Sequence, residues 1–185
     1  MLKQLQKCLK TEKKDRTIFD IIVYGSTIQG KEKPNDIDIV VIFHEGTLKD
    51  RLKKIQQIKK KIKLDQKIDI KTILLHELFT PAFFARTGIF LEGISLFDKV
   101  PFSSKIGFSS HALFTYHLED KTHTEKVKFN YVLSGRNDKG MLKHLEAKRL
   151  RPGVLQVPIK NTHECEQILR LHKISYNKKE ILIKH

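Results

Sequence analysis

Three short apolar runs and one long amphipathic run dominate the first half of this chain and restrict the folds open to it. The apolar runs cover residues 17–24, 37–43 and 67–75 and are rich in β-branched and aromatic residues, which is typical of strands. Between the last two, apolar residues recur every three or four positions from Leu48 to Ile62, as on one face of a helix. This order predicts an α+β fold in which a short mixed sheet is flanked by helices.

The chain is strongly basic. It has 36 Lys and Arg against 21 Asp and Glu in 185 residues, a formal net charge of +15. Such a charge attracts nucleic acid, nucleotide phosphates or an anionic membrane surface. Residues 1–98 hold 19 basic and 13 acidic side chains, whereas residues 99–185 hold 17 and 8. The second half is therefore the more basic. In the first half, the lysines of the helix expected over residues 48–63 are best explained as its solvated face.

The same sequence favours a cytoplasmic location. No apolar run approaches the roughly 20 residues that a membrane-spanning helix needs. The first 16 residues lack the apolar core of a signal peptide. The only cysteines, Cys8 and Cys165, form neither a CxxC pair nor a disulfide framework. We therefore expect a reduced, cytoplasmic protein with no membrane partner.

The sequence changes character over residues 98–110, which hold one Pro, one Gly and four Ser with little periodicity. We expect a catalytic domain over 1–98 and a smaller, basic α+β lobe over 111–185 that can bind substrate. The elements expected in the lobe are strands over 112–118 and 154–159, helices over 122–134, 141–150 and 161–171, and a hairpin over 174–183. The 122–134 segment is ambiguous, because its apolar residues also alternate as in a strand.

A turn and two acids link the first two strands of the catalytic half. Gly25-Ser26 ends the first strand, and nine residues later Asp36 and Asp38 open the second. Side chains two apart on a strand point to one face, about 7 Å apart. Such carboxylates repel each other unless a cation lies between them, and Mg²⁺ prefers oxygen ligands. Gly25 lets the backbone approach a ligand, and a helix beginning at Ser26 would favour a phosphate.

A third acid, Asp69, lies in the middle of the 67–75 strand, where an unpaired buried carboxylate is costly. If this strand pairs beside the one that carries Asp36 and Asp38, the three carboxylates share a face and can hold two Mg²⁺ ions. Such a pair supports in-line displacement at a phosphate, with pyrophosphate leaving. Simpler explanations stay open: a turn and cap for the first two acids, and a solvent-facing edge strand for Asp69.

This combination of strand, Gly-Ser turn, fixed spacing and three strand acids resembles the DNA polymerase β-like nucleotidyltransferase superfamily. It looks most like the minimal nucleotidyltransferases of archaea and bacteria, which include relatives of kanamycin nucleotidyltransferase and the antitoxins paired with HEPN toxins. The resemblance covers about residues 17–97, and Gly30, Pro34 and Asn35 also match the loop of that family. It implies a polymerase β-like core with the C-terminal lobe outside it.

The resemblance also implies roles for the site residues. Asp36 and Asp38 would bind both metal ions, Mg²⁺ or Mn²⁺, and Asp69 would ligate the catalytic ion and act as base. Gly25 and Ser26 would bind the phosphates of an NTP, with ATP favoured.

One departure from the family pattern concerns the charge that meets the triphosphate. Many relatives have an Arg shortly after the Gly-Ser pair, where this chain has Thr27-Ile28-Gln29. We expect Lys33, or else Lys31 or a lysine of the second lobe, to meet the phosphate charge instead.

Basic residues of the second lobe are candidates for binding nucleic acid, because a loop and helix start with basic neighbours can grip phosphate. A solvated basic surface explains them equally well. The candidates are Arg136, Lys139, Lys148, Arg149 and Arg151. Three aromatic residues, Phe114, Phe129 and Tyr131, can stack on bases, although their pattern favours a core.

We therefore expect an enzyme that transfers a nucleoside monophosphate from an NTP to a hydroxyl, releasing pyrophosphate. The basic lobe suggests RNA as the acceptor, such as the 3′ end of a tRNA, because phosphate contacts need no particular sequence. Two alternatives stay open: an antitoxin-like transferase that adenylylates a partner protein, and a non-catalytic protein that binds RNA.

Overall fold

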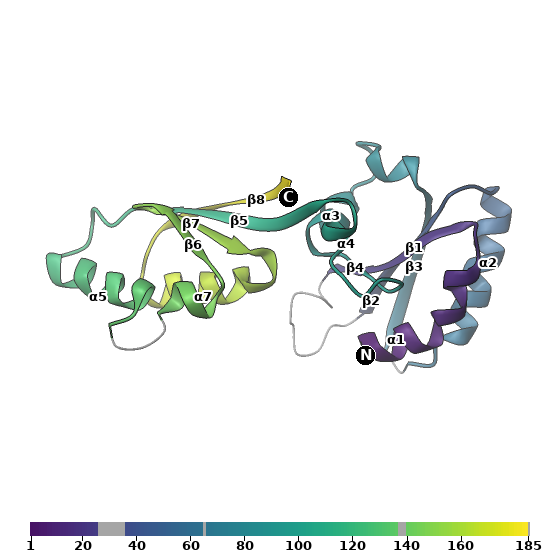
Figure 1. The fold of residues 1–185 in the computed structure, drawn as a ribbon, viewed down its shortest axis with the longest axis horizontal. Coiled ribbons are helices and arrows are strands. Elements are labelled where there is room, and N and C mark those ends of the chain that lie inside the picture. Colours follow the sequence, from purple (N-terminus) through teal and green to yellow (C-terminus); the bar gives the residue numbers. More distant parts are fainter. Residues whose placement is uncertain (26–35, 65, 137–139, 185) are drawn as a thin grey trace. The chain divides into compact units, whose positions relative to one another are not determined.

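The computed structural model describes residues 1–25, 36–64, 66–136 and 140–184 and divides the chain into two compact units (Figure 1). The first unit is Met1–Gly107 and the second is Phe108–His185. The 98–110 segment holds a short helix of the first unit and the start of a strand of the second. None of the described helices has the length and apolar character required to cross a bilayer.

The first unit holds the strands and the helix that the apolar patterns predict. In chain order its elements are α1 (Leu2–Cys8), η1 (Lys10–Lys14), β1 (Ile18–Tyr24), β2 (Asp36–Phe43), α2 (Leu48–Lys61), β3 (Lys67–Leu74), η3 (His76–Phe79), α3 (Arg86–Glu92), β4 (Ile94–Ser95) and α4 (Phe102–Lys105). Pro81 lies in a turn before α3.

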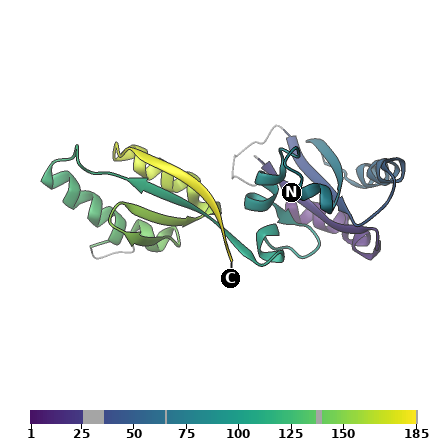
Figure 2. The same ribbon diagram turned by 90° about the horizontal axis from the view of Figure 1, so that it is seen from above.

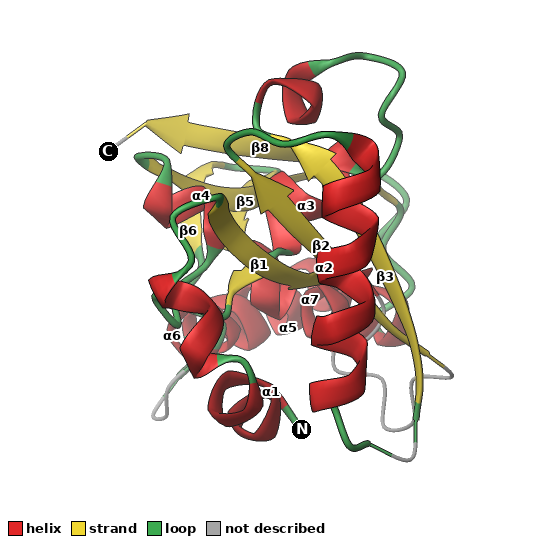
Figure 3. Ribbon diagram, turned by 90° about the vertical axis from the view of Figure 1, so that its right-hand side faces the viewer, coloured by secondary structure: helices red, strands yellow, loops and turns green. Residues whose placement is uncertain are grey.

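The sheet of the first unit has the strand order β3-β2-β1-β4 and is mixed. β1 runs antiparallel to both of its neighbours, whereas β2 and β3 are parallel. The two central strands are apolar on both faces because helices cover both faces. One face packs on α1 and α2, and the other packs on η3, α3 and α4 (Figures 1 and 3). Each fully buried Ile or Val in such a core contributes about 1.5–3 kcal/mol.

Helix α2 begins where its cap residue predicts. The hydroxyl of Thr47 accepts a hydrogen bond from the backbone N–H of Asp50, which satisfies one of the free donors of the first turn. Ile55 and Ile58 point into the core, and the lysines of the opposite side are largely exposed. The helix therefore closes one face of the sheet and presents a basic face to solvent.

The second unit is an antiparallel sheet with helices on one face. Its elements are β5 (Phe108–Tyr116), α5 (His123–Ser134), α6 (Met141–His144), β6 (Lys148–Arg151), β7 (Val154–Pro158), η4 (Ile159–Asn161), α7 (Thr162–Leu171) and β8 (Tyr176–Lys184). The strand order is β6-β7-β5-β8, and β8 runs beside the whole of β5 (Figure 2). Helices α5, α6 and α7 pack on one face of this sheet, and the described residues place no helix on the other.

Helix α5 resolves the ambiguous 122–134 segment in favour of a helix. Thr122 and Glu125 form a complete capping box, in which each side chain accepts a hydrogen bond from the backbone N–H of the other. Phe129 and Leu133, four residues apart, are the residues that this helix buries. Tyr131 lies outside that buried stripe and is 47% exposed.

Two sequence predictions for the second unit are wrong. The helix expected over 141–150 ends at His144, because Glu146 has a positive φ of 53° and Lys148–Arg151 pairs with β7 as strand β6. The hairpin expected over 174–183 is one continuous strand, β8. In both places a neighbouring strand offers hydrogen bonds that outweigh the local preference.

Candidate active site

Three carboxylates lie on one face of two adjacent strands in the first unit. β2 and β3 are parallel, with Asp38 directly opposite Asp69 and Asp36 opposite Lys67. Adjacent strands are about 4.8 Å apart, and alternate residues of a strand share a face. The condition that the sequence left open is therefore met, because Asp69 lies beside the strand that carries Asp36 and Asp38.

These acids lie at one end of the sheet face that η3, α3 and α4 cover. Along that face, the apolar residues Ile22, Val40 and Ile42 are buried beneath the helices. Asp38 is partly buried at the end of this core, and the Asp69 side chain is 49% exposed. The site thus has a rigid, packed base and an open rim.

Gly25 closes the end of β1 against the carboxylate of Asp38. Its φ is +79°, a conformation that side-chain-bearing residues rarely adopt. A Cβ atom at this position would lie 2.7 Å from Oδ2 of Asp38, too close for any real contact. Backbone geometry and side-chain contact therefore both require glycine next to the acids.

The acids repel one another. Burial raises the pKa of Asp38, and the negative charges of Asp36 and Asp69 raise it further. A cation placed among these oxygens would relieve the repulsion. The donor set consists of carboxylate oxygens alone, which is the set that Mg²⁺ and Mn²⁺ prefer. The residues therefore fit a hard divalent cation, although no group of three acidic, His or Cys side chains within the described ranges forms a ready-made metal site.

Two further residues reach the same place, and the sequence reasoning missed both. Nζ of Lys71 lies 3.6 Å from Oδ2 of Asp69, and proximity to Tyr24 and then to Asp69 raises the pKa of Lys71, so it stays protonated. Tyr24 lies opposite Asp38 on β1 and is 6% exposed, and burial raises the pKa of its hydroxyl. The Asp69-x-Lys71 spacing on a strand was the available signal, since residues two apart share a face.

The comparison with known families identifies this arrangement. A family model described as Polymerase beta, Nucleotidyltransferase matches residues 3–100, more than half of the chain. The chain belongs to the polymerase β nucleotidyltransferase family. It matches no curated protein and no solved structure.

Membership of the polymerase β family indicates an enzyme that performs nucleotidyl transfer, which agrees with the resemblance read from the Gly-Ser turn and the three acids. The matched residues include the whole mixed sheet and all three carboxylates. The match ends before β5 begins at Phe108, so the second unit lies outside it.

Part of the site predicted for this nucleotidyltransferase lies outside the described residues. The turn residue Ser26 and the phosphate candidate Lys33 fall within 26–35, and Lys139 falls within 137–139. Two described lysines lie beside the acids: Lys71, whose Nζ is 3.6 Å from Oδ2 of Asp69, and Lys67, which is opposite Asp36 in the pairing of β2 and β3.

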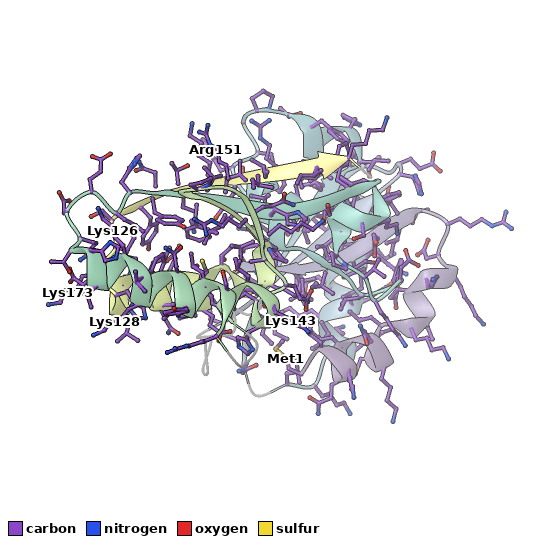
Figure 4. All side chains as sticks on the ribbon, turned by 60° about the vertical axis from the view of Figure 1, so that its left-hand side comes forward. Met1, Lys126, Lys128, Lys143, Arg151 and Lys173 are labelled. Carbon is purple, nitrogen blue, oxygen red and sulfur yellow. The ribbon has the colours of Figure 1, made fainter. Side chains whose placement is uncertain are left out.

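Of the basic residues predicted to bind nucleic acid, the four that the structure describes do not form one patch. Lys148 lies opposite Gln156, on the sheet face that carries no described helix, whereas Arg149 faces the other way and donates to Oδ1 of Asn130 on α5 at 3.3 Å. Arg136 lies over the ring of Tyr131, with 5.3 Å between Cζ and the ring centroid. Arg151 lies on the strand side of the unit, away from the lysines on the helix side (Figure 4).

Proposed function

We propose that this chain is a metal-dependent nucleotidyltransferase that moves a nucleoside monophosphate from an NTP, with ATP favoured, to a hydroxyl of RNA. The observation that carries the proposal is the register that sets Asp38 beside Asp69, with Asp36 two residues away on the same face. In the reaction, a bond forms between the acceptor oxygen and the α-phosphorus. The bond from that phosphorus to the β-phosphate oxygen breaks, and pyrophosphate leaves.

The three acids have distinct proposed roles. Asp36 and Asp38 would hold two Mg²⁺ or Mn²⁺ ions, and Asp69 would complete the catalytic ion's ligand set. When bound, these ions lower the pKa of the attacking hydroxyl and neutralise the leaving pyrophosphate. Asp69 is the most exposed of the three and so is placed to accept the proton from the acceptor hydroxyl.

The phosphates would be bound by the turn and by one lysine. Gly25 allows the backbone to approach the triphosphate, with Ser26 next to it. Lys71 is protonated and lies beside the acids, so it can replace the arginine that many relatives have after the Gly-Ser pair. Before the nucleotide binds, it pairs with Asp69 at 3.6 Å, which partly offsets the charge of the acids.

The charge of the second unit supports RNA as the acceptor. Residues 99–185 hold 17 basic and 8 acidic side chains, and a neutral small-molecule acceptor would not require this excess. The proposed setting is the cytoplasm, where the unpaired cysteines Cys8 and Cys165 stay reduced.

The test is a labelling reaction. The full chain is incubated with NTPs labelled at the α-phosphate, Mg²⁺ or Mn²⁺, total RNA and total protein. Label in RNA supports the proposal, label in protein supports the antitoxin-like alternative, and RNA binding without any labelling supports a non-catalytic protein. Labelling must be lost in Asp36→Asn and Asp69→Asn and retained in Asp120→Asn, an exposed aspartate of the second unit. Labelling that persists in the first two variants overturns the metal assignment.

A further inference from the structure

The second unit contains a pocket that nucleotidyl transfer in the first unit does not explain. It lies between the end of α5, the start of α6 and the end of α7, and has a volume of about 590 Å³. Pockets that bind small ligands in proteins have volumes of about 300–1,000 Å³. Apolar side chains make up much of its lining: Val132, Met141, Ile168 and Leu171.

One wall of the pocket is an aromatic ring with a cation over it. Tyr131 is 47% exposed, although Phe129 and Leu133 of the same helix are buried. The guanidinium carbon of Arg136 lies 5.3 Å from the centroid of this ring. Nucleobases stack on aromatic rings, and an arginine beside the ring adds a cation–π contribution.

The charged side chains nearest the pocket are mostly basic: Arg136 lines it, and Lys143 and Lys173 each adjoin a lining histidine in the chain. Among the described residues, four lysines on the helix side of this unit make no ion pair: Lys126, Lys128, Lys143 and Lys173 (Figure 4). Lys143 lies on the same short helix as Met141 and His144, which both line the pocket. The nearby acid Glu164 is already bound to His144 at 2.8 Å. The pocket therefore suits a flat apolar group that carries negative charge.

We propose that this pocket binds an unpaired nucleobase of a single-stranded RNA. The base would stack on Tyr131 and cover the apolar lining, while Arg136 and Lys143 would contact the flanking phosphates. This inference rests on the proposed function, because it assigns to the RNA acceptor a binding site within the second unit. It differs from a purely electrostatic contact, since the affinity includes a term from the bases as well as from the backbone.

The experiment uses the absence of tryptophan from this chain. In Tyr131→Trp the new indole is the only one present, and a stacked base quenches its emission. The full-length variant is titrated with single-stranded RNA of about eight nucleotides, within the span that single-strand binders cover. The same titration uses an RNA of equal length in which the sugars carry no bases. The matched control is Phe84→Trp, which alters an aromatic residue of the first unit that is 93% exposed.

We expect RNA with bases to quench Tyr131→Trp and not Phe84→Trp, and RNA without bases to quench neither. Tyr131→Ala should weaken binding of the RNA with bases about tenfold and leave binding of the base-free RNA unchanged. RNA binding, seen by fluorescence anisotropy, without quenching of Tyr131→Trp overturns the pocket and leaves the proposed acceptor intact. Quenching without transfer of label to RNA supports the pocket and overturns the acceptor. The pocket is also overturned if Tyr131→Ala weakens binding of the RNA with bases and of the base-free RNA equally.

Discussion

The two units of this chain differ in how deeply their ion pairs are buried. In the first unit, buried acids are paired across the fold: Asp20 with Lys105 at 2.6 Å, and Glu12 with Lys54 at 2.8 Å. In the second unit the pair of Lys160 with Glu146 is exposed, and four lysines make no ion pair with any described residue: Lys126, Lys128, Lys143 and Lys173. The net charge of +15 therefore includes two kinds of cation: those whose ion pairs stabilise the fold, and those that are available to bind an anionic partner.

The active-site acids are the exception within the first unit, because there like charges are placed together. Asp38→Asn should reduce nucleotidyl transfer by roughly 10³-fold, because the metal ions that neutralise the phosphate charge would lose a central ligand. The free energy of unfolding should stay equal or rise, because burial, and then repulsion by the neighbouring acids, raises the pKa of Asp38. Radiolabel transfer and urea denaturation measure the two effects. A large loss of stability would show that Asp38 is structural instead.

The buried pair in the first unit offers the next largest effect. Lys105→Met leaves the fully buried carboxylate of Asp20 without its cation, which should lower the stability of this unit by about 3 kcal/mol. Hydrogen exchange of β1 peptides, followed by mass spectrometry, reports on this unit alone. Lys160→Met, which removes an exposed pair of the second unit with Glu146, should change stability by less than about 1 kcal/mol. Equal effects would remove the contrast between the units.

Acid should weaken the first unit through Asp15. A hydrogen bond from Lys54, followed by one from Thr17, lowers the pKa of Asp15 from 3.8 to about 2. The unfolded chain therefore takes up this proton first as the pH falls. The stabilisation is present above about pH 4 and is lost as the pH falls through about 2, a difference of roughly 1–2 kcal/mol.

Lys54→Met provides the matching variant for that pH dependence. It removes the leading cause of the shift, so its stability should be lower near neutral pH and should fall less between pH 4 and pH 2. Hydrogen exchange of the β1 amides at a series of pH values measures the stability of the parent protein and of Lys54→Met. Parallel loss in the parent and the variant would rule out this pair as the source.

The smallest expected effect concerns the free lysines. Lys143→Gln should weaken binding of single-stranded RNA a few-fold and reduce the slope of log affinity against log salt by about 0.7. Lys60→Gln, on the exposed face of α2 in the first unit, should change neither. If Lys60→Gln has the same effect as Lys143→Gln, RNA contacts both units and the lysines of α2 are not merely solvated.

Local sequence predicted the first unit well because its strands have strong signals of their own. The apolar runs of β1 and β2 and the periodicity of α2 are properties of neighbouring residues. The register that sets Asp38 beside Asp69 is not, since β2 and β3 are separated by a helix and their pairing depends on packing of the whole sheet. The three acids could therefore be identified from the sequence. Whether they lie together depended on the pairing of β2 with β3, which the sequence could state only as a condition.

The second unit was harder to predict because long-range pairing decides its elements. Residues 148–151 continue a helical pattern, yet they form β6 since β7 lies beside them. Asn177 and Lys179 suggested a turn, yet they pair with Thr115 and Leu113 of β5. Tyr131 was expected in the core, and only the buried stripe of α5 shows that it lies outside. Its proximity to Arg136 depends on how the chain leaves that helix.

The pairing of β5 with β8 sets an order of events during synthesis. β5 begins the second unit at Phe108, but its partner along its full length, β8, starts only at Tyr176. All strands of the first sheet have been made once Ser95 is in place. The unit that carries the acids can thus fold while the ribosome is still making the rest, since domains generally fold as units in the order of synthesis. The central strand of the second unit must wait, half-paired, until β8 has emerged.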